Sequence, residues 1–456
     1  MGSHLVRGVI SVPSGVVTAL VEAGKEDMLL SSQSRIRVME GAKDNLPDQA
    51  AQAAAQEIHT LANGLQDGDL LVVLISGGGS ALLPAPIAPV TLDEVMDVTR
   101  RMARAGASIV QLNAVRKQLE ALKGGGLAEA AQPARVISLI LSDVIGDPLD
   151  FIASGPTVPD RTTPEECLDL FAQLSIQDSI PESVKTLLTS TKSETQDQAR
   201  SVDWSRVHNV LVGTNKIACE KAKETSDELG YQSIILSTEQ EGEAREVSQM
   251  FATLASYISH LLVDGLSSGN NREEEIQKLE RSLLVYPSLS VDKLKEIRQL
   301  AVRAKEMQRG VCIISGGETT VMVKGNGRGG RNQEMAVSAA LELQRFLPAS
   351  AQTDLTVQKQ DSSTSKTCDE ISPPSIVFLA AGTDGQDGPT PVAGAVVSPR
   401  FCEQAQSSGV NVIEFLDRND SYNLLTQVDE GANLVVPGLT GTNVMDIQVL
   451  LVKPGV

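Results

Sequence analysis

Short, strongly apolar runs punctuate the sequence, and a longer stretch with helical periodicity follows each of them. The runs that we expect to form strands span residues 5–12, 70–76, 135–142, 207–213 and 232–237. Consecutive parallel strands need a crossover, which is usually a helix, so this alternation predicts a parallel sheet covered by helices. We therefore expect an α/β fold.

End signals support the helices between these runs. Asp48 precedes an Ala-rich stretch, and Thr91 with Glu94 has the spacing of a capping box. Three glycines at 124–126 should stop the helix that ends in VRKQLEALK, because glycine enters the left-handed region at little steric cost.

The length of 456 residues exceeds what one hydrophobic core usually serves, so we expect two domains. The first should span 1–261 and the second 309–456, joined by a charged helical bridge at 262–308. The second domain should contain strands at 311–317, 319–325 and 375–382 and a helix at 331–346. A polar segment, 348–374, is expected to be a disordered insertion.

Composition limits the classes of partner. The net charge of −19 disfavours nucleic acid and anionic membranes, and no apolar run approaches the ~20 residues of a membrane span. The five cysteines lack metal-binding spacing and are expected to be reduced, structural thiols. We expect a cytoplasmic monomer or homodimer that acts on a small molecule, although a longer form could carry a mitochondrial leader.

A glycine-rich loop follows the second apolar run. Ser76, Gly77, Gly78, Gly79 and Ser80 can present successive backbone N–H groups to phosphate oxygens, and Gly124 and Gly125 belong to a similar loop. A tight turn is the alternative interpretation of such a loop. Further loops combine glycine with hydroxyl, cationic or carboxylate groups, namely SGPT (154–157), SGGE (315–318), GNGRGGRNQE (325–334) and GTDGQDGPT (382–390). Loops at the carboxyl ends of strands commonly form ligand sites, so we predict that these loops converge.

Charged side chains suited to phosphoryl transfer lie in or beside these loops. Arg116, Lys123, Arg328 and Arg331 could bind phosphate or a substrate carboxylate, or could be surface charges. The carboxylates Asp143, Asp147, Asp384 and Asp387 follow apolar runs and suit magnesium or a catalytic base, although Asp beside Gly is more often a turn former or cap.

A rival motif is GxGxxG at Gly325, Gly327 and Gly330, between an expected strand and an expected helix. It would indicate a dinucleotide site. The acidic residue that should end a following strand about 20 residues later is missing, so the match is incomplete.

Longer motifs resemble a known family, the glycerate kinases that join a MOFRL-associated domain to a MOFRL domain. They are LISGGGSALLPAP (74–86), LNAVRKQLEALKGGGLA (112–128), SLILSDVIGDPLDFIASGPT (138–157), GEAREV (242–247), GGETTVMVKGNGRGGRNQEMA (316–336), GTDGQDGPTPVAGAVV (382–397), NDSYN (419–423) and TGTNVMD (440–446). Their order and length cover nearly the whole chain.

The resemblance implies a Rossmann-like domain followed by a smaller α/β domain, with an active site in the cleft between them. It also implies ATP and Mg²⁺ as cofactors, D-glycerate as substrate and 2-phosphoglycerate as product. We assign catalysis to Asp384, Arg331 and Lys123, the phosphates to the loops at 76–80 and 124–125, and the metal to Asp143, Asp147 and Asp387. We assign the substrate to Asn113, Arg116, Ser154, Asn332 and Glu334.

One departure from the family concerns the N-terminus. Family members begin with a further strand and a GxGKA-type turn, whose lysine is thought to contact the reacting groups, and the sequence here matches the family downstream of that segment. We therefore expect an N-terminally incomplete first domain with weak or no activity. Two alternative functions stay open, a reductase acting on hydroxypyruvate and an inactive nucleotide-binding protein.

Overall fold

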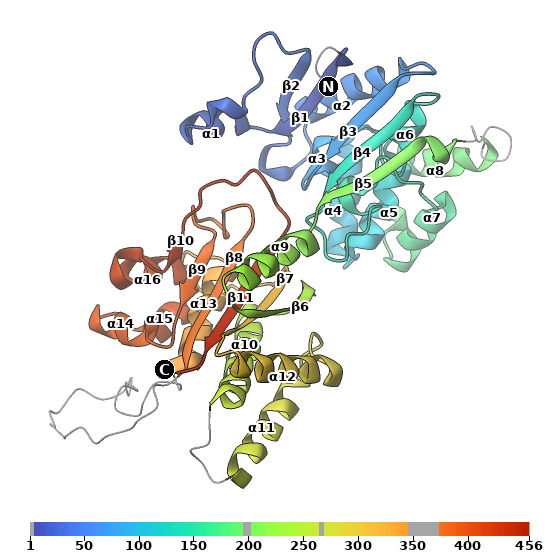
Figure 1. The fold of residues 1–456 in the computed structure, drawn as a ribbon. Coiled ribbons are helices and arrows are strands. Elements are labelled where there is room, and N and C mark those ends of the chain that lie inside the picture. The colour runs from blue at the N-terminus through green and yellow to red at the C-terminus, as the bar shows by residue number, and fades with distance from the viewer. Residues whose placement is uncertain (1–3, 195–201, 264–268, 345–373, 456) are drawn as a thin grey trace. The chain divides into compact units, whose positions relative to one another are not determined.

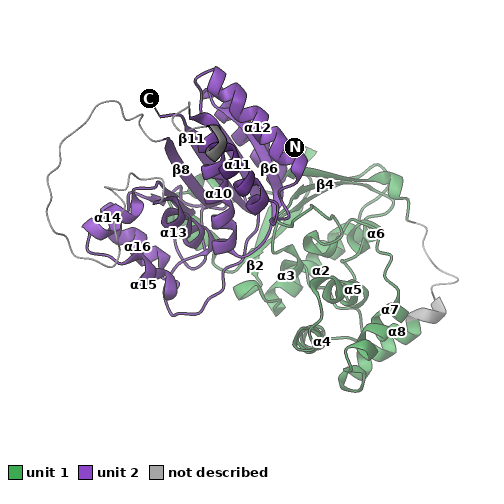
Figure 2. Ribbon diagram, turned by 90° about the horizontal axis from the view of Figure 1, so that it is seen from below, with its two compact units in different colours: residues 1–213 green, residues 214–456 purple. Residues whose placement is uncertain are grey.

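The computed structural model describes residues 4–194, 202–263, 269–344 and 374–455, and it confirms the α/β class. The chain forms two compact units, Met1–Gly213 and Thr214–Val456, shown in green and purple in Figure 2. Each unit contains its own sheet and its own core.

Unit 1 contains two parallel sheets. Strands β3 (Leu70–Ile75), β4 (Arg135–Leu141) and β5 (Val207–Gly213) pair in that order. Strands β1 (Gly8–Pro13) and β2 (Ile36–Gly41) form a separate parallel pair. The predicted runs at 5–12, 70–76, 135–142 and 207–213 are thus strands, as Figure 1 shows, whereas β2 was not predicted.

Helices cover one face of the three-stranded sheet. Ala55 and Ala62 of α2 (Gln49–Asn63) and Leu127 of α6 (Gly126–Ala130) pack with Val136 of β4. A second layer packs around Met102 and Phe171. It consists of α4 (Leu92–Arg104), α5 (Ile109–Leu119), α7 (Pro164–Gln173) and α8 (Glu182–Glu194). The remaining helices of this unit are α1 (Val16–Glu22) and α3 (Gly79–Leu82).

The predicted helix starts are present. The Asp48 carboxylate accepts a hydrogen bond from the Ala51 amide at 2.8 Å, and Thr91 with Glu94 forms a complete capping box. Helix α5 ends at Leu119, five residues before the first of the predicted stop glycines. The intervening residues form a turn, and Gly125 then adopts a φ of 90° before α6 begins.

Unit 2 is built on one six-stranded sheet with the order β10-β9-β8-β11-β7-β6. Its strands are β6 (Gln232–Gln240), β7 (Val311–Gly317), β8 (Ser375–Gly382), β9 (Gly394–Val397), β10 (Leu434–Val435) and β11 (Asp446–Lys453). β6 runs parallel to β7, and the other pairs are antiparallel. The long strand β11 therefore lies in the middle of the sheet and pairs with both β7 and β8.

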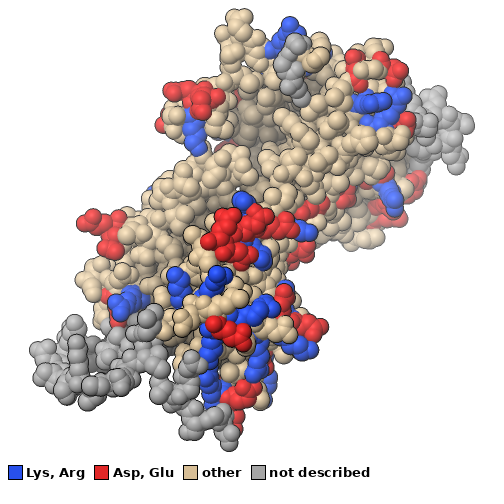
Figure 3. Space-filling model, viewed as in Figure 1, with Lys and Arg blue, Asp and Glu red and all other residues tan. Residues whose placement is uncertain are grey.

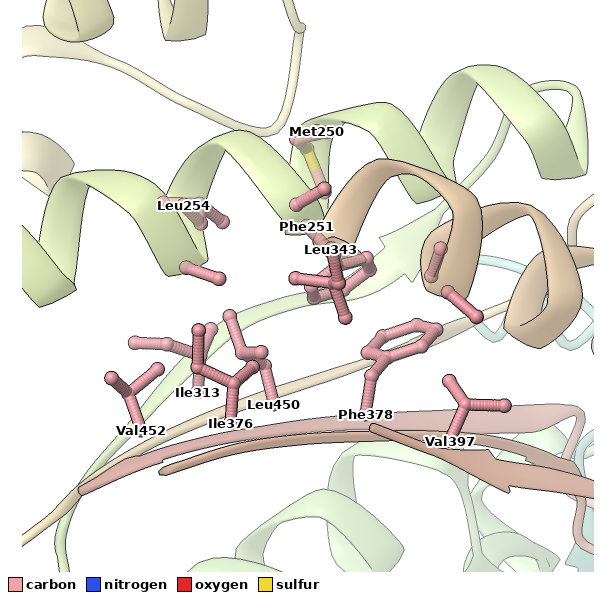
Figure 4. Close-up of a cluster of buried hydrophobic side chains, with 14 of the residues drawn as sticks. Met250, Phe251, Leu254, Ile313, Leu343, Ile376, Phe378, Val397, Leu450 and Val452 are labelled. Atoms are coloured by element: carbon pink, nitrogen blue, oxygen red, sulfur yellow. The ribbon is translucent and has the colours of Figure 1, made fainter. Parts of the chain in front are cut away.

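The core of unit 2 lies between this sheet and two helices, α10 (Ala244–Leu262) and α13 (Arg331–Leu343). Phe251 of α10 and Phe378 of β8 are in contact, with ring centroids 4.9 Å apart, in the cluster shown in Figure 4. Helix α9 (Asn215–Glu228) covers the opposite face. The outer helices are α11 (Gly269–Leu283), α12 (Val291–Glu306), α14 (Phe401–Ser407), α15 (Val412–Asp417) and α16 (Ser421–Gln427).

The division between the units differs from the expected domain boundary at 261. β6 pairs with β7, and α10 packs on α13, so both elements belong to unit 2. Ile276 of α11 and Ile297 of α12 are buried in the same core. The described part of the segment expected to bridge two domains at 262–308 is therefore an integral layer of unit 2.

The strand predicted at 319–325 is wrong. Thr320 makes a single bridge to Glu243, and the amides of Lys324 and Gly325 donate to the Asn419 side chain instead of a neighbouring strand. Apart from Pro374, the insertion predicted at 348–374 lies outside the described residues.

The cysteine prediction holds for the four cysteines that the structure describes, Cys167, Cys219, Cys312 and Cys402, which are free and buried. Cys368 lies outside the described residues. None of the described helices is both long enough and apolar enough to cross a membrane.

Removing the Phe378 ring should leave a cavity between the sheet and α10. We expect Phe378→Ala to lower the free energy of unfolding by about 3–5 kcal/mol, measured by chemical denaturation. Val436→Ala is the control, because Val436 is exposed, and it should change stability by less than about 0.5 kcal/mol. A loss below about 1 kcal/mol for Phe378→Ala would contradict this account of the core.

Candidate functional site

Four loops of unit 1 meet at the carboxyl ends of β3 and β4. A Cβ on Gly77 would lie 1.9 Å from Oδ2 of Asp143, and a Cβ on Gly79 would lie 2.8 Å from the Cβ of Ala153. The loop at 76–80 therefore needs glycine at both positions to approach the segments that follow β4. Three of the six loops that we predicted to converge, at 76–80, 124–126 and 154–157, thus meet within this unit.

Hydrogen bonds fix the same loops to one another. The amides of Gly124 and Gly125 donate to the carbonyls of Ser154 and Gly155 at 2.9 and 2.7 Å. The hydroxyls of Ser80 and Ser154 are 2.8 Å apart, and the Ser154 hydroxyl also contacts the Asn113 side chain at 3.4 Å. Three residues predicted for phosphate or substrate, Ser80, Ser154 and Asn113, are thus neighbours.

Lys123 is buried beneath these loops, and its ammonium group is hydrogen-bonded. Its Nζ donates to the carbonyls of Ser80 and Leu83 at 3.0 and 3.1 Å and to the Glu120 carboxylate at 2.8 Å, and the residue is 3% exposed. Burial lowers the pKa of Lys123, and the charge of Glu120 opposes this. The geometry gives Lys123 the task of holding the 76–83 segment, whereas we predicted a catalytic contact.

Arg116 is the cation of this region with unused donors. Its guanidinium is partly buried, and among the described residues it makes no ion pair or hydrogen bond. Burial lowers the pKa of Arg116, and the nearby Glu120 charge opposes that effect. A desolvated guanidinium without a partner favours an anionic ligand, since burying a charge alone is unfavourable.

Asp143 and Asp147 lie in the loop after β4, beside the glycine-rich loop. Burial raises the pKa of Asp143, and Oδ1 of Asp147 is buried without a hydrogen-bond partner. Both carboxylates therefore retain oxygens for a ligand. No group of three or more His, Cys, Asp or Glu side chains within the described ranges could hold a metal alone, so a cation here would need further oxygens from a ligand.

In unit 2, Arg331 begins α13 and is held from two sides. Its Nε and Nη2 donate to the two oxygens of Asp446 at 2.6 and 3.0 Å, and its Nη1 lies 2.9 Å from Glu318. Burial disfavours the charged guanidinium, but these carboxylates outweigh that effect and raise the pKa of Arg331. The partly exposed guanidinium is rigid and keeps N–H groups for another acceptor.

The two carboxylates of the GTDGQDG loop have different surroundings. Asp384 is partly exposed and accepts one hydrogen bond, from the Gln386 amide at 2.9 Å. Asp387 is buried and accepts from the Asn332 and Gln333 amides at 3.1 and 2.9 Å, so it caps α13. This geometry favours a chemical role for Asp384. For Asp387 it favours a structural role as a helix cap instead of the predicted metal contact.

The predicted substrate residues Asn332 and Glu334 are both buried. Glu334 pairs with Arg245, which donates from Nε at 2.8 Å, and accepts from Asn419 at 3.1 Å. Burial raises the pKa of Glu334, and Arg245 opposes this. Glu334 therefore ties together α10, α13 and the loop before α16, while Oδ1 of Asn332 is buried without a hydrogen-bond partner.

Sequence reasoning missed the partners that hold these groups, namely Glu120, Arg245, Asn419 and Asp446. All four fall inside the family motifs given above, and Glu120 also lies just before the predicted glycine stop. Their roles depend on contacts between segments far apart in the sequence, such as the 115 residues that separate Arg331 from Asp446. No local sequence pattern predicts such a pairing.

The rival dinucleotide motif has a packing explanation. A Cβ on Gly325 would lie 2.3 Å from the Arg418 carbonyl, and one on Gly327 would lie 2.4 Å from the Cβ of Asp420. The glycines thus permit close approach of the 418–420 segment. The preceding strand that a dinucleotide fold requires is absent from the described residues 319–325.

Asp143 generates a pH prediction. Its raised pKa means that the folded state binds a proton more tightly than the unfolded state, so this group lowers stability as pH rises above about 4, the ordinary carboxyl range. Asp143→Asn should therefore be more stable than the parent at pH 7, and the difference should shrink toward pH 4. Denaturation curves across this range would test it, and a variant less stable at pH 7 would contradict it.

Comparisons with known proteins follow the same division of the chain. Residues 2–189 match the model of a domain of unknown function, DUF4147, and residues 311–446 match the MOFRL family. The chain is 43% identical to human glycerate kinase over 456 residues, covering 100% of this chain and 81% of the human protein. It is 32% identical to D-glycerate 2-kinase of Thermotoga maritima, covering 89% of this chain and 78% of that protein.

A solved structure agrees with these relatives. The crystal structure of glycerate kinase from Thermotoga maritima matches with a TM-score of 0.70 at 30% identity, covering 98% of this chain and 85% of that chain. Both domain models, the full-length identity and the shared fold point to one family. The chain belongs to the glycerate kinases that combine a DUF4147 domain with a MOFRL domain.

Proposed function

We propose that this protein transfers a phosphoryl group from ATP to D-glycerate and forms 2-phosphoglycerate. The observation that carries the proposal is the partly buried, unpartnered Arg116 beside a glycine-rich loop. The chain as a whole has a net charge of −19 and repels anions, so this guanidinium would provide a local site that attracts one. The names of the relatives supply the substrate. We also propose a cytoplasmic location.

Unit 1 would bind the nucleotide phosphates. The backbone at 76–80 is fixed from below by Lys123 and from the side by Ser154, so its amides are held in place before a ligand arrives. Arg116 would neutralise phosphate charge. Lys123 contributes by fixing the loop.

Asp143 and Asp147 fit a magnesium ion. Mg²⁺ is usually bound by one or two carboxylates together with substrate phosphates, and both side chains retain free oxygens beside the glycine-rich loop. When bound, the ion would neutralise charge on the phosphates. Asp387 does not fit, because the amides of α13 occupy its oxygens.

Arg331 and Asp384 would act on the acceptor and the transferred group. Asp384 has a free carboxylate oxygen with which to accept the proton of the attacking hydroxyl. Arg331, oriented by Asp446 and Glu318, would stabilise charge on the transferred phosphoryl oxygens. Asn332 is fully buried, so it would support the site from beneath Arg331 and not contact the substrate.

The direct test measures ADP release with ATP, Mg²⁺ and D-glycerate. It should use the 456-residue chain beside a form extended ahead of Met1 by a family-type segment. Release that depends on D-glycerate in either form supports the proposal. Silence in both forms, or oxidation of NADH with hydroxypyruvate, contradicts it.

Asp384→Asn should separate chemistry from folding. It keeps an oxygen that can accept from the Gln386 amide, so thermal stability should be unchanged, while loss of the base should lower kcat by roughly 100-fold or more. Asp417→Asn, on an exposed helix end, is the matched control. A rate within about threefold of the parent for Asp384→Asn would rule out the assigned role.

Arg116→Gln should weaken nucleotide binding independently of turnover. Charge-assisted hydrogen bonds contribute about 1.5–3 kcal/mol, so we expect the Kd for ATP, measured by calorimetry, to rise roughly 10- to 100-fold. Arg104→Gln, an exposed arginine in the same layer, should leave the Kd unchanged. Equal Kd values for both variants would show that Arg116 does not contact the nucleotide.

A further inference from the structure

A pocket within unit 1 lies beside the loops described above and takes no part in the assignments made so far. Its cavity volume is about 560 Å³, and its walls come from α5 and from the segments 149–151 and 158–162. Small-molecule sites usually measure ~300–1,000 Å³ and have mainly apolar walls with a few polar groups. The apolar wall of this pocket consists of Val110, Ala114, Leu149, Phe151, Val158 and Pro159.

Ionic contacts and hydrogen bonds hold the walls of this pocket in place. The ammonium group of Lys117, whose side chain is 7% exposed, lies 3.3 Å from Asp150 and 3.6 Å from Asp160. The side-chain amide of Gln118 donates to Asp160 at 3.2 Å and to the Thr162 carbonyl at 2.9 Å. These contacts tie both loop segments to α5, so the pocket is formed before a ligand binds, which lowers the cost of binding.

Asn113 connects the pocket to the glycine-rich loop. It lines the pocket, and its side chain contacts the Ser154 hydroxyl, which lies 2.8 Å from the hydroxyl of Ser80. Arg116 and Lys117 follow Asn113 on α5 at positions i+3 and i+4, which share one side of a helix. A ligand whose phosphates lie on the glycine-rich loop and near Arg116 can therefore extend into the pocket.

The charges of the pocket do not favour an anion. Two cations, Lys117 and Arg161, and two carboxylates, Asp150 and Asp160, line it, so the lining has no net charge. It thus lacks the positive excess that would attract an anion to a chain of net charge −19, whose acidic side chains gather over α9 in Figure 3. D-glycerate would also fill only a small part of the volume. An uncharged, partly apolar group suits the pocket better.

We propose that this pocket holds the nucleoside part of ATP while the phosphates lie on the glycine-rich loop, an inference that rests on the proposed kinase function. A nucleobase is flat and uncharged, so it suits the apolar wall. Oδ2 of Asp150 accepts from Lys117, and within the described residues Oδ1 of Asp150 accepts no hydrogen bond. The side chain of Asp150 is 45% exposed, and its free oxygen matches the hydroxyl donors of a ribose.

Ala114→Phe tests the pocket by filling it. Ala114 lines the cavity, so a phenyl ring there should raise the Kd of the 456-residue chain for ADP at least about tenfold, measured by calorimetry. The Kd values for inorganic tripolyphosphate, which has no nucleoside, and for D-glycerate should not change. Ala103→Phe is the matched control, because Ala103 is exposed on α4, and it should leave all three Kd values unchanged.

Asp150→Ala tests the ribose contact. The parent should bind 2′,3′-dideoxy-ADP about tenfold more weakly than ADP, because a hydrogen bond to a charged group is lost. In Asp150→Ala the two nucleotides should bind equally. The ratio is taken within one variant, so any general effect of losing the ion pair with Lys117 cancels. A ratio that is the same in Asp150→Ala as in the parent would contradict the ribose contact.

Other results would overturn the pocket assignment itself. Equal weakening of ADP and tripolyphosphate by Ala114→Phe would assign the pocket to the phosphates, and weaker binding of D-glycerate alone would assign it to the acceptor. An unchanged Kd for ADP, or no binding of ADP by the parent, would leave the pocket without a nucleotide. These measurements do not depend on turnover. Binding of ADP without any D-glycerate-dependent release of ADP from ATP would therefore contradict the proposed reaction and not the pocket assignment.

Discussion

A buried charge is costly unless a fixed partner replaces the water that it has lost, and this constraint holds the loops of both units in place. Lys123 meets it by donating to two carbonyls and to Glu120, and Glu334 meets it through Arg245 and Asn419. Apart from the contact between Lys123 and Glu120, each of these contacts joins segments distant in sequence. The loops therefore take their shape from these buried contacts as well as from their own glycines.

The α/β class, four strands of unit 1 and the capped helix starts could be predicted from the sequence, because apolar runs and capping residues act over short distances. The strand at 319–325 could not be excluded in the same way, since its backbone groups bond to the side chain of Asn419. The role of Lys123 was misjudged for a related reason. A lysine beside glycines indicates a phosphate site. In the fold, however, Lys123 is buried and donates to Ser80, Leu83 and Glu120, and the sequence alone does not show these contacts.

Asp384 and Asp387 show how neighbouring carboxylates acquire different tasks. They are three residues apart in one loop, yet only Asp387 reaches the amides of α13. That contact removes Asp387 from the solvent, and the turn leaves one oxygen of Asp384 free. The local sequence predicts the same chemistry for both carboxylates. The position of α13 decides which of them is free to react.

The cap on α13 has a consequence for how this unit meets an anion. Helix N-termini commonly bind phosphate through their free amides, but here Asp387 already occupies the amides of Asn332 and Gln333. At this end of α13 the attraction for a negatively charged ligand thus comes from the guanidinium of Arg331, which two carboxylates hold and which is partly exposed to solvent ions. Added salt should consequently weaken anion binding by this unit more strongly than it would weaken binding at a site made of backbone amides.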